Sequence, residues 1–231
     1  ICSNGSCAFD KDGNLLFEHE IDKETIHKIF DAFNKYSMEP SLYTTEGRIS
    51  LLPLEERKIY TRDVFIPAIQ INHPDMKYTL DDFRELVDNV IFVDGQEALL
   101  NSDHRILKIS SNSTDHEALK KLRVELEKIP GLAVVSTVPT DIEITSIHAQ
   151  KGSTLLDYAK RDGLTPDEIV AIGDSENDYS MLSIPGIHSV AMENACDMIR
   201  NICVYQTRAN TRDGIAYIIN CILADRENFT L

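Results

Sequence analysis

Two acidic residues follow a short apolar run in the last third of the chain. Glu168 to Ile172 are predicted to form a strand buried on both faces, and Gly173 allows a sharp turn after it. Asp174 would then lie at the carboxyl end of a parallel strand, where open α/β sheets bind their ligands. Asp178 follows on the first turn of the next helix, so both carboxylates can border one small volume. The arrangement suits a cation; the alternative is a helix N-cap with a solvated acidic turn.

A lysine precedes this loop by some twenty residues. Lys151 stands between Gln150 and Gly152, just before a predicted helix. A lysine in such a place is commonly a solvated surface charge. Its spacing to the acidic loop makes it a candidate for the same site, beside Asp174 and Asp178.

Composition limits the classes of partner. The chain has 231 residues, enough for one large domain or two small ones, and its 42% apolar and 26% charged residues are typical of a globular protein. The net charge of −15 is spread along the chain, which argues against nucleic acid or an anionic membrane as the main partner. No apolar run approaches the length of a membrane span.

The five cysteines form an odd set, without a CxxC pair or zinc-type spacing to histidine. We interpret them as reduced thiols, mostly small core residues, of a cytoplasmic protein. No cleavable signal pattern is present at the start of the sequence.

Helical and strand patterns divide the chain near residue 148. Before it, hairpins are predicted at 6–18 and 41–52, helices after Asp22, after Thr79 and over 115–128, and strands at 90–93, 105–109, 132–138 and 141–147. This order predicts a mixed α/β layer with an antiparallel sheet. After it, helices at 152–161, from 193 and at 213–223 alternate with strands at 168–172, 188–192 and 202–206, which predicts a doubly wound parallel sheet.

The motifs of the second half occur in a distinctive order. Lys151-Gly152 is followed by Gly173-Asp174-Ser-Glu-Asn177-Asp178, then Pro185-Gly186, Asn194-Ala195 and Asp213-Gly214. This order resembles the haloacid dehalogenase superfamily, specifically the Cof-type phosphatases. The resemblance is strong from Glu143 onward and looser before it. It implies an α/β fold: a Rossmann-like doubly wound core from 1–18 and 146–231, with an inserted α/β cap over 19–145.

The resemblance also implies roles for individual residues. Lys151 matches the lysine that contacts the phosphoryl group and the nucleophile. Asp174 and Asp178 match the Mg²⁺ ligands, with Asp178 also steadying Lys151. Asn177 would hold phosphate or Lys151 by hydrogen bonding, and Asn4, of the Asn-Gly leading into the cap, would border the phosphate pocket. Asn194 matches a turn asparagine for which a purely structural role is at least as well supported.

The nucleophilic aspartate of the family is harder to place. Asp10-Lys-Asp12-Gly13 has the form of its motif, but no buried apolar strand precedes it, and a polar hairpin turn fits these residues better. We therefore expect the nucleophile and the next motif to precede Ile1. A parallel sheet without the family's first strand would leave buried backbone groups of its neighbours unpaired.

The resemblance implies a Mg²⁺-dependent phosphatase acting through an aspartyl phosphate on a small phosphorylated metabolite, with a sugar phosphate favoured. One alternative is a phosphomutase of the same fold. Another is a non-catalytic protein that binds phosphate and Mg²⁺ but lacks the nucleophile. The sequence does not indicate an oligomeric state.

Overall fold

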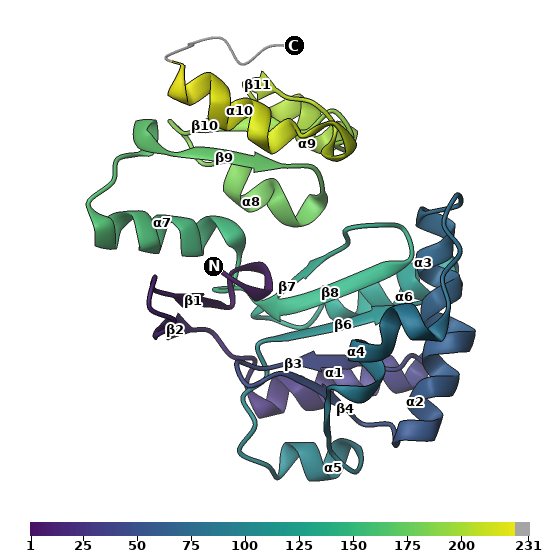
Figure 1. The fold of residues 1–231 in the computed structure, drawn as a ribbon. Helices are drawn as coiled ribbons and strands as arrows, with labels where there is room; N and C mark the ends of the chain where they lie inside the picture. Colours follow the sequence, from purple (N-terminus) through teal and green to yellow (C-terminus); the bar gives the residue numbers. More distant parts are fainter. Residues whose placement is uncertain (225–231) are drawn as a thin grey trace. The chain divides into compact units, whose positions relative to one another are not determined.

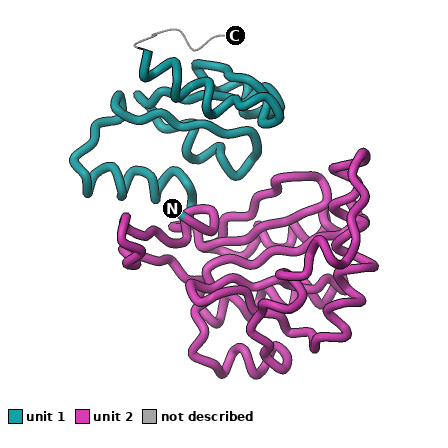
Figure 2. Tube along the Cα trace, in the orientation of Figure 1, with its two compact units in different colours: residues 1, 150–231 teal, residues 2–149 magenta. Residues whose placement is uncertain are grey.

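The structure is a computed structural model that describes residues 1–224. The chain is built of helices and strands in both halves and divides into two compact units (Figure 2). The larger unit spans residues 2–149, and the smaller unit consists of residue 1 and the chain from residue 150 onward. No helix within residues 1–224 is long and apolar enough to cross a membrane.

The larger unit contains a six-stranded sheet in the order β5-β4-β3-β6-β8-β7 (Figure 1). Its strands are β3 (Ser41–Tyr43), β4 (Arg48–Ser50), β5 (Ile91–Phe92), β6 (Lys108–Asn112), β7 (Leu132–Val135) and β8 (Asp141–Ser146). All neighbours pair antiparallel except β4 and β5, which are parallel. The predicted mixed α/β layer with an antiparallel sheet is therefore confirmed.

Two amphipathic helices of this unit supply much of its core. α1 (Lys23–Lys35) begins at the predicted cap, where the Asp22 carboxylate accepts from the backbone N–H of Thr25 at 2.9 Å. The apolar face of α1 is buried, and it packs in one cluster with side chains of α6 (His116–Leu126) and of the sheet. Each helix thereby buries one face and leaves its charged face in solvent.

Residues 2–18 form a short 3₁₀ turn, Ser3–Gly5, and the predicted hairpin of β1 (Cys7–Phe9) and β2 (Leu15–Glu18). The Ser6 hydroxyl donates to the carbonyl of Leu107, and the N–H of His19 donates to the carbonyl of Ser6. These contacts place residues 2–18 in the larger unit, whereas the sequence analysis grouped 1–18 with 146–231. The assignment of core and cap stays a prediction.

Several helices of the larger unit were not predicted. They are α2 (Leu54–Tyr60), a π-helical turn (Thr61–Phe65), α3 (Ile66–Asn72) and α5 (Gly95–Leu100). The predicted helix after Thr79 is split into a 3₁₀ turn (Leu80–Phe83) and α4 (Arg84–Asp88). Short helices broken by a π turn give little 3.6-residue periodicity, which is why the sequence did not reveal the helices over 54–72.

The smaller unit contains a parallel sheet in the order β11-β10-β9, as predicted for this half (Figure 1). Its strands are β9 (Val170–Gly173), β10 (His188–Ala191) and β11 (Tyr205–Gln206). One face of the sheet packs against residues of α7 (Lys151–Asp162), α8 (Tyr179–Leu182) and α9 (Asp197–Ile202), and the other against α10 (Gly214–Leu223). The sheet is thus covered on both faces.

Three element boundaries in this unit differ from the prediction. Glu168 belongs to the 3₁₀ turn Pro166–Glu168, and its carboxylate accepts from the backbone N–H of Thr165 in a capping box. β9 therefore starts only at Val170. α9 starts at Asp197 rather than at Glu193. β11 comprises two residues instead of five. The second difference matters for the site, because it leaves Glu193 and Asn194 in a loop.

Candidate functional site

The loop after β9 is folded around the carboxylate of Asp178. Ser175 is the N-cap of the 3₁₀ turn Glu176–Asp178, and Asp178 is its third residue. One oxygen of Asp178, Oδ2, accepts from the backbone N–H groups of Asp174 (2.9 Å) and Ser175 (3.2 Å). Asp178 is only 5% exposed. The expected N-cap arrangement is therefore present, but the capping carboxylate is buried rather than solvated.

The other oxygen of Asp178 holds Lys151. Lys151 Nζ donates to Asp178 Oδ1 at 2.6 Å, and the lysine side chain is 28% exposed. A carboxylate with so little access to water needs such partners, because an unpaired buried charge is strongly destabilising. Lys151 thus keeps part of its surface in solvent while its ammonium group is fixed at the loop.

Two glycines, Gly152 and Gly173, allow the close contacts that bring Lys151 and Asp178 together. A Cβ on Gly152 would lie 2.1 Å from the carbonyl oxygen of Ser180, so only glycine allows α7 to approach α8 this closely. The N–H of Gly152 also donates to the Ser180 hydroxyl at 3.1 Å. A Cβ on Gly173 would lie 2.5 Å from Cγ of Asp178, so the last residue of β9 must leave room for that carboxyl group.

Asp174, half-buried, projects its carboxylate among neutral donors. Its Oδ2 accepts from the side-chain amide of Asn194 at 2.8 Å, and its Oδ1 accepts from the Ser175 hydroxyl at 3.1 Å. Asn194 is fixed in turn, because its Oδ1 accepts from the N–H of Asn210 at 3.0 Å. The role of Asn194 that the sequence left open therefore includes a direct contact with Asp174.

The donors around Asp174 leave its negative charge without a cationic partner. Within residues 1–224, Asp174 forms no ion pair with lysine or arginine, and its two bonded neighbours are an amide and a hydroxyl. A half-buried carboxylate of this kind fits Mg²⁺, which prefers oxygen ligands and binds through one or two carboxylates while keeping water. The same residues include no group of three or more His, Cys, Asp or Glu side chains placed to hold a metal.

The structure places the other predicted residues as follows. Asn177 lies in the 3₁₀ turn between Asp174 and Asp178, half-buried. Asn4 belongs to the larger unit, in a left-handed conformation, and its amide donates to Oε2 of Glu143 at 2.7 Å. The other oxygen of Glu143 accepts from Lys108 at 2.6 Å. The role of Asn4 at a phosphate group stays a prediction.

Asp10 and Asp12 belong to the turn of the β1–β2 hairpin. Asp10 Oδ1 accepts from the backbone N–H groups of Asp12 and Asn14, each at 2.9 Å, and its Oδ2 accepts from the Asn14 amide. Asp12 is exposed beside Lys11. The preferred interpretation of this segment as a polar hairpin turn is confirmed.

Sequence reasoning missed Ser180, whose hydroxyl and carbonyl both meet Gly152. It also missed the backbone bond from the N–H of Cys196 to the carbonyl of Asp174 at 2.9 Å. Neither residue type carries a chemical signal by itself. The glycine at position 152, directly after the candidate lysine, is the one feature that could have indicated a close helix contact.

Comparison with known proteins identifies the relatives of this chain. A family profile described as haloacid dehalogenase-like hydrolase matches residues 1–219. The chain is 27% identical over 226 residues to the 5-amino-6-(5-phospho-D-ribitylamino)uracil phosphatase YwtE of Bacillus subtilis, covering 97% of this chain and 78% of that protein. It is 26% identical over 229 residues to the B. subtilis phosphatase YwpJ, covering 96% and 79%.

Solved structures show the same fold. A haloacid dehalogenase-like hydrolase from B. subtilis superposes with a TM-score of 0.77 at 24% identity, covering 94% of this chain and 76% of the other. A sugar phosphatase of subclass IIB of the superfamily superposes with a TM-score of 0.69 at 19% identity, covering 95% and 73%. At these identities the superpositions bear on the fold, and the α/β class predicted from the sequence is confirmed.

Proposed function

The chain belongs to the haloacid dehalogenase-like hydrolase family, and from this premise we propose that it hydrolyses the phosphate monoester of a small metabolite with Mg²⁺. One observation carries the proposal. Lys151 and Asp178 form a mostly buried ion pair at the carboxyl end of β9, beside a carboxylate, Asp174, that has no cationic partner within residues 1–224. A cationic donor next to a metal-binding carboxylate is what a dianionic phosphoryl group requires.

Each residue of the site would have a separate task. Lys151 would donate to a phosphoryl oxygen and balance its charge. Asp174 would hold Mg²⁺, which supplies charge neutralisation of the phosphoryl oxygens when bound. Asp178 would act mainly by fixing Lys151 and the backbone of the loop, since both its oxygens already accept hydrogen bonds; any metal contact through it would be additional.

Asn177, in the turn within the loop, is a further proposed phosphate contact. The contact of Asn4 with phosphate is proposed from the family resemblance alone. The covalent step proposed from the family resemblance is attack by a carboxylate oxygen on phosphorus, which breaks the bond to the ester oxygen. A second carboxyl group protonates that oxygen so that the alcohol leaves, and water then hydrolyses the aspartyl phosphate. Asp10 does not suit this role, because its carboxylate is committed to the hairpin turn by three hydrogen bonds. The nucleophile is therefore proposed to come from outside the residues identified at this site.

The proposed substrate class is a sugar or sugar-alcohol phosphate. It is supported by the names of two relatives, a phospho-D-ribitylamino-uracil phosphatase and a sugar phosphatase. Release of inorganic phosphate from a panel of phosphorylated sugars, sugar alcohols and nucleotides, compared as kcat/KM, tests it. A preference for nucleotides throughout the panel would refute this substrate class.

The experiment that tests the reaction measures hydrolysis of p-nitrophenyl phosphate by the intact protein with and without Mg²⁺. We expect turnover only with Mg²⁺, and a loss of at least about 100-fold in kcat/KM for Lys151→Ala and for Asp174→Ala. Asp12→Ala, in the exposed hairpin turn, is the matched control and should retain nearly full activity, as should Asp10→Ala. Turnover without any divalent metal would refute the role of Mg²⁺, and an inactive Asp10→Ala that is still folded would reassign the nucleophile.

A further inference from the structure

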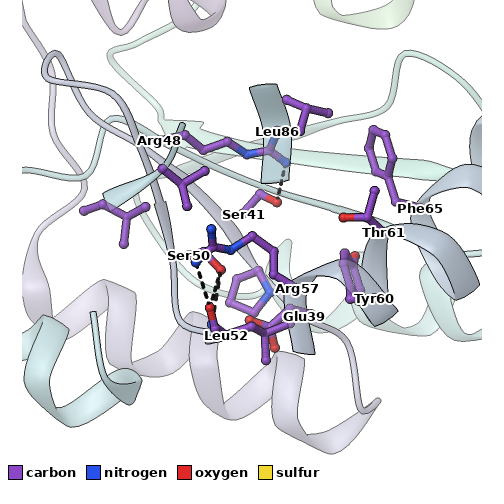
Figure 3. A pocket seen from close by; sticks show the side chains of 13 residues that line it. Glu39, Ser41, Arg48, Ser50, Leu52, Arg57, Tyr60, Thr61, Phe65 and Leu86 are labelled. Atoms are coloured by element: carbon purple, nitrogen blue, oxygen red, sulfur yellow. Dashed lines mark hydrogen bonds between the residues drawn. The ribbon is translucent and has the colours of Figure 1, made fainter. Parts of the chain in front are cut away.

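The larger unit contains a small pocket lined by polar and apolar side chains (Figure 3). Strands β3 and β4, helix α2 and the π turn after it supply most of its wall. Its polar lining residues are Glu39, Ser41, Arg48, Ser50, Arg57, Tyr60 and Thr61. The cavity volume is about 30 Å³, which is room for about two water molecules. The pocket is therefore too small for a metabolite.

Arg57 is the most unusual residue of the lining. It is only 7% exposed, and its terminal nitrogens donate to the backbone carbonyls of Val87 and, at 3.0 Å, of Leu52. Its third nitrogen, Nε, is buried and has no hydrogen-bond partner in the described chain. Arg57 forms no ion pair within residues 1–224; the negative charge of Asp88 acts on it only from beyond ion-pair distance.

A second guanidinium group adds to this charge. Arg48 donates through Nη2 to the Ser41 hydroxyl at 2.8 Å and lies over the ring of Tyr43, with no carboxylate partner among residues 1–224. Burial lowers the pKa of Arg57, the charge of Asp88 raises it, and the charge of Arg48 lowers it further. Two positive groups therefore border one small space and repel each other.

Glu39 does not neutralise the two arginines at acidic pH. Burial, and secondarily the charge of Glu56, raise the pKa of Glu39 from 4.5 to about 7. Its Oε1 is buried and has no hydrogen-bond partner in the described chain. Below pH 7 the lining consequently carries two positive charges, a neutral carboxyl group and the hydroxyl groups of Ser41 and Thr61, which can donate to an anion.

We propose that this pocket binds one small monovalent anion of the size of chloride, held by Arg57 and Arg48. The volume admits a single ion of that size, whereas a phosphate ester or a nucleotide would not fit. A cation is disfavoured by the two guanidinium groups. The ion would accept from the buried Nε of Arg57 and reduce the repulsion between the two arginines. This proposal is independent of the phosphatase activity.

The first test measures thermal unfolding of the intact protein at pH 6 while sodium chloride replaces sodium gluconate at constant ionic strength. We expect a saturable rise in Tm of about 3–5 °C once chloride exceeds its Kd tenfold. Arg48→Gln should weaken chloride binding at least about tenfold, as should Arg57→Gln if that variant folds. Arg62→Gln removes an exposed arginine outside the pocket and should leave the chloride response unchanged.

The second test locates the ion directly. Crystals soaked in sodium bromide should show an anomalous scattering peak within about 3.5 Å of Arg57 Nε. Density without an anomalous signal, together with a Tm that does not respond to chloride, would show that the pocket holds only water and would overturn the proposal. A chloride response of Arg48→Gln equal to that of the unchanged protein would also overturn the assignment to this pocket.

Discussion

Asp178 and Asp174 stand four residues apart and have different surroundings. Asp178 is buried and accepts from one ammonium and two backbone groups, so it is committed to holding the loop and Lys151. Asp174 is bonded only to neutral donors, of which one, Asn194, is exposed. Of the two carboxylates, Asp174 is thus the one with no charged partner among residues 1–224, and Asp178 contacts Lys151 as the family resemblance implied.

Glu39 gives a residue-scale prediction of pH dependence. Its pKa rises from 4.5 in the unfolded chain to about 7 in the fold, so between these values the folded state binds more protons. Stability must then fall as the pH rises from 4.5 to 7, and the loss remains above pH 7. Glu39→Gln removes this loss. At pH 4.5 we expect the variant to have the same free energy of unfolding as the unchanged protein. At pH 8 we expect its free energy of unfolding to be larger by about 1–2 kcal/mol, a value discounted for the partial exposure of Glu39.

Urea unfolding of both proteins over pH 4.5–8 measures this difference. Glu46→Gln, in the exposed turn between β3 and β4, is the control and should show no such growth with pH. A Glu39→Gln variant whose stability follows the unchanged protein at every pH would show that Glu39 ionises as an ordinary solvated carboxyl group.

At the scale of elements, the contact between α7 and α8 positions the lysine. Because the atoms nearest a Cβ on Gly152 are backbone atoms of Ser180, at 2.1 Å and 2.5 Å, no side-chain rotation can relieve the clash. We expect Gly152→Ala to separate the two helices, destabilise the fold by about 1–3 kcal/mol and reduce kcat at least about tenfold by moving Lys151 from Asp178.

Urea unfolding and phosphatase kinetics on the same preparation check both effects. Lys160→Ala, at an exposed position of the same helix, is the matched control. Full activity in a folded Gly152→Ala variant would show that the close helix approach is not what places Lys151.

The sequence predicted those elements whose signals are local. The cap at Asp22, the hairpin turn at Asp10 and the strand that ends at Gly173 each depend on neighbouring residues, and all three are present. The predicted start of α9 was wrong, because Asn194 is held in a loop by hydrogen bonds with Asp174 and Asn210, which are distant in sequence. The helices around Arg57 were missed because they are short and interrupted by a π turn.

The distinction between local signals and long-range packing also applies to the candidate phosphate site and to the pocket around Arg57. The order of Lys151 and Asp178 along the chain, with the family resemblance, predicted that they meet, and the structure joins these two residues directly. The metal and phosphate roles of Lys151, Asp174 and Asp178 stay predictions. The pocket proposed to bind an anion could not be predicted, because Arg48 and Arg57 reach it from a strand and a separate helix and are notable only for their burial. Burial of a charged side chain follows from packing, which a single sequence does not display.

At the scale of the whole molecule, each unit has its own hydrophobic core. The core of the larger unit is built on α1, α6 and the six-stranded sheet, and the smaller unit has one cluster on each face of its parallel sheet. The two proposed anion sites are divided in the same way. Phosphate would bind at the loop 173–178 of the smaller unit, and chloride at the pocket of the larger unit.

This division predicts separate responses in hydrogen exchange of the intact protein. Mg²⁺ gluconate with inorganic phosphate should slow amide exchange in peptides covering 173–178, where Asp178 already binds two backbone N–H groups. Chloride in place of gluconate should instead slow exchange in peptides covering 48–65, because ion binding stabilises the elements that supply Arg48 and Arg57. Mass spectrometry of peptic fragments at constant ionic strength resolves the two regions. Equal protection of both regions by chloride would indicate a general salt effect and contradict a discrete site, whereas phosphate protection confined to 48–65 would contradict the placement of the phosphoryl group beside Lys151.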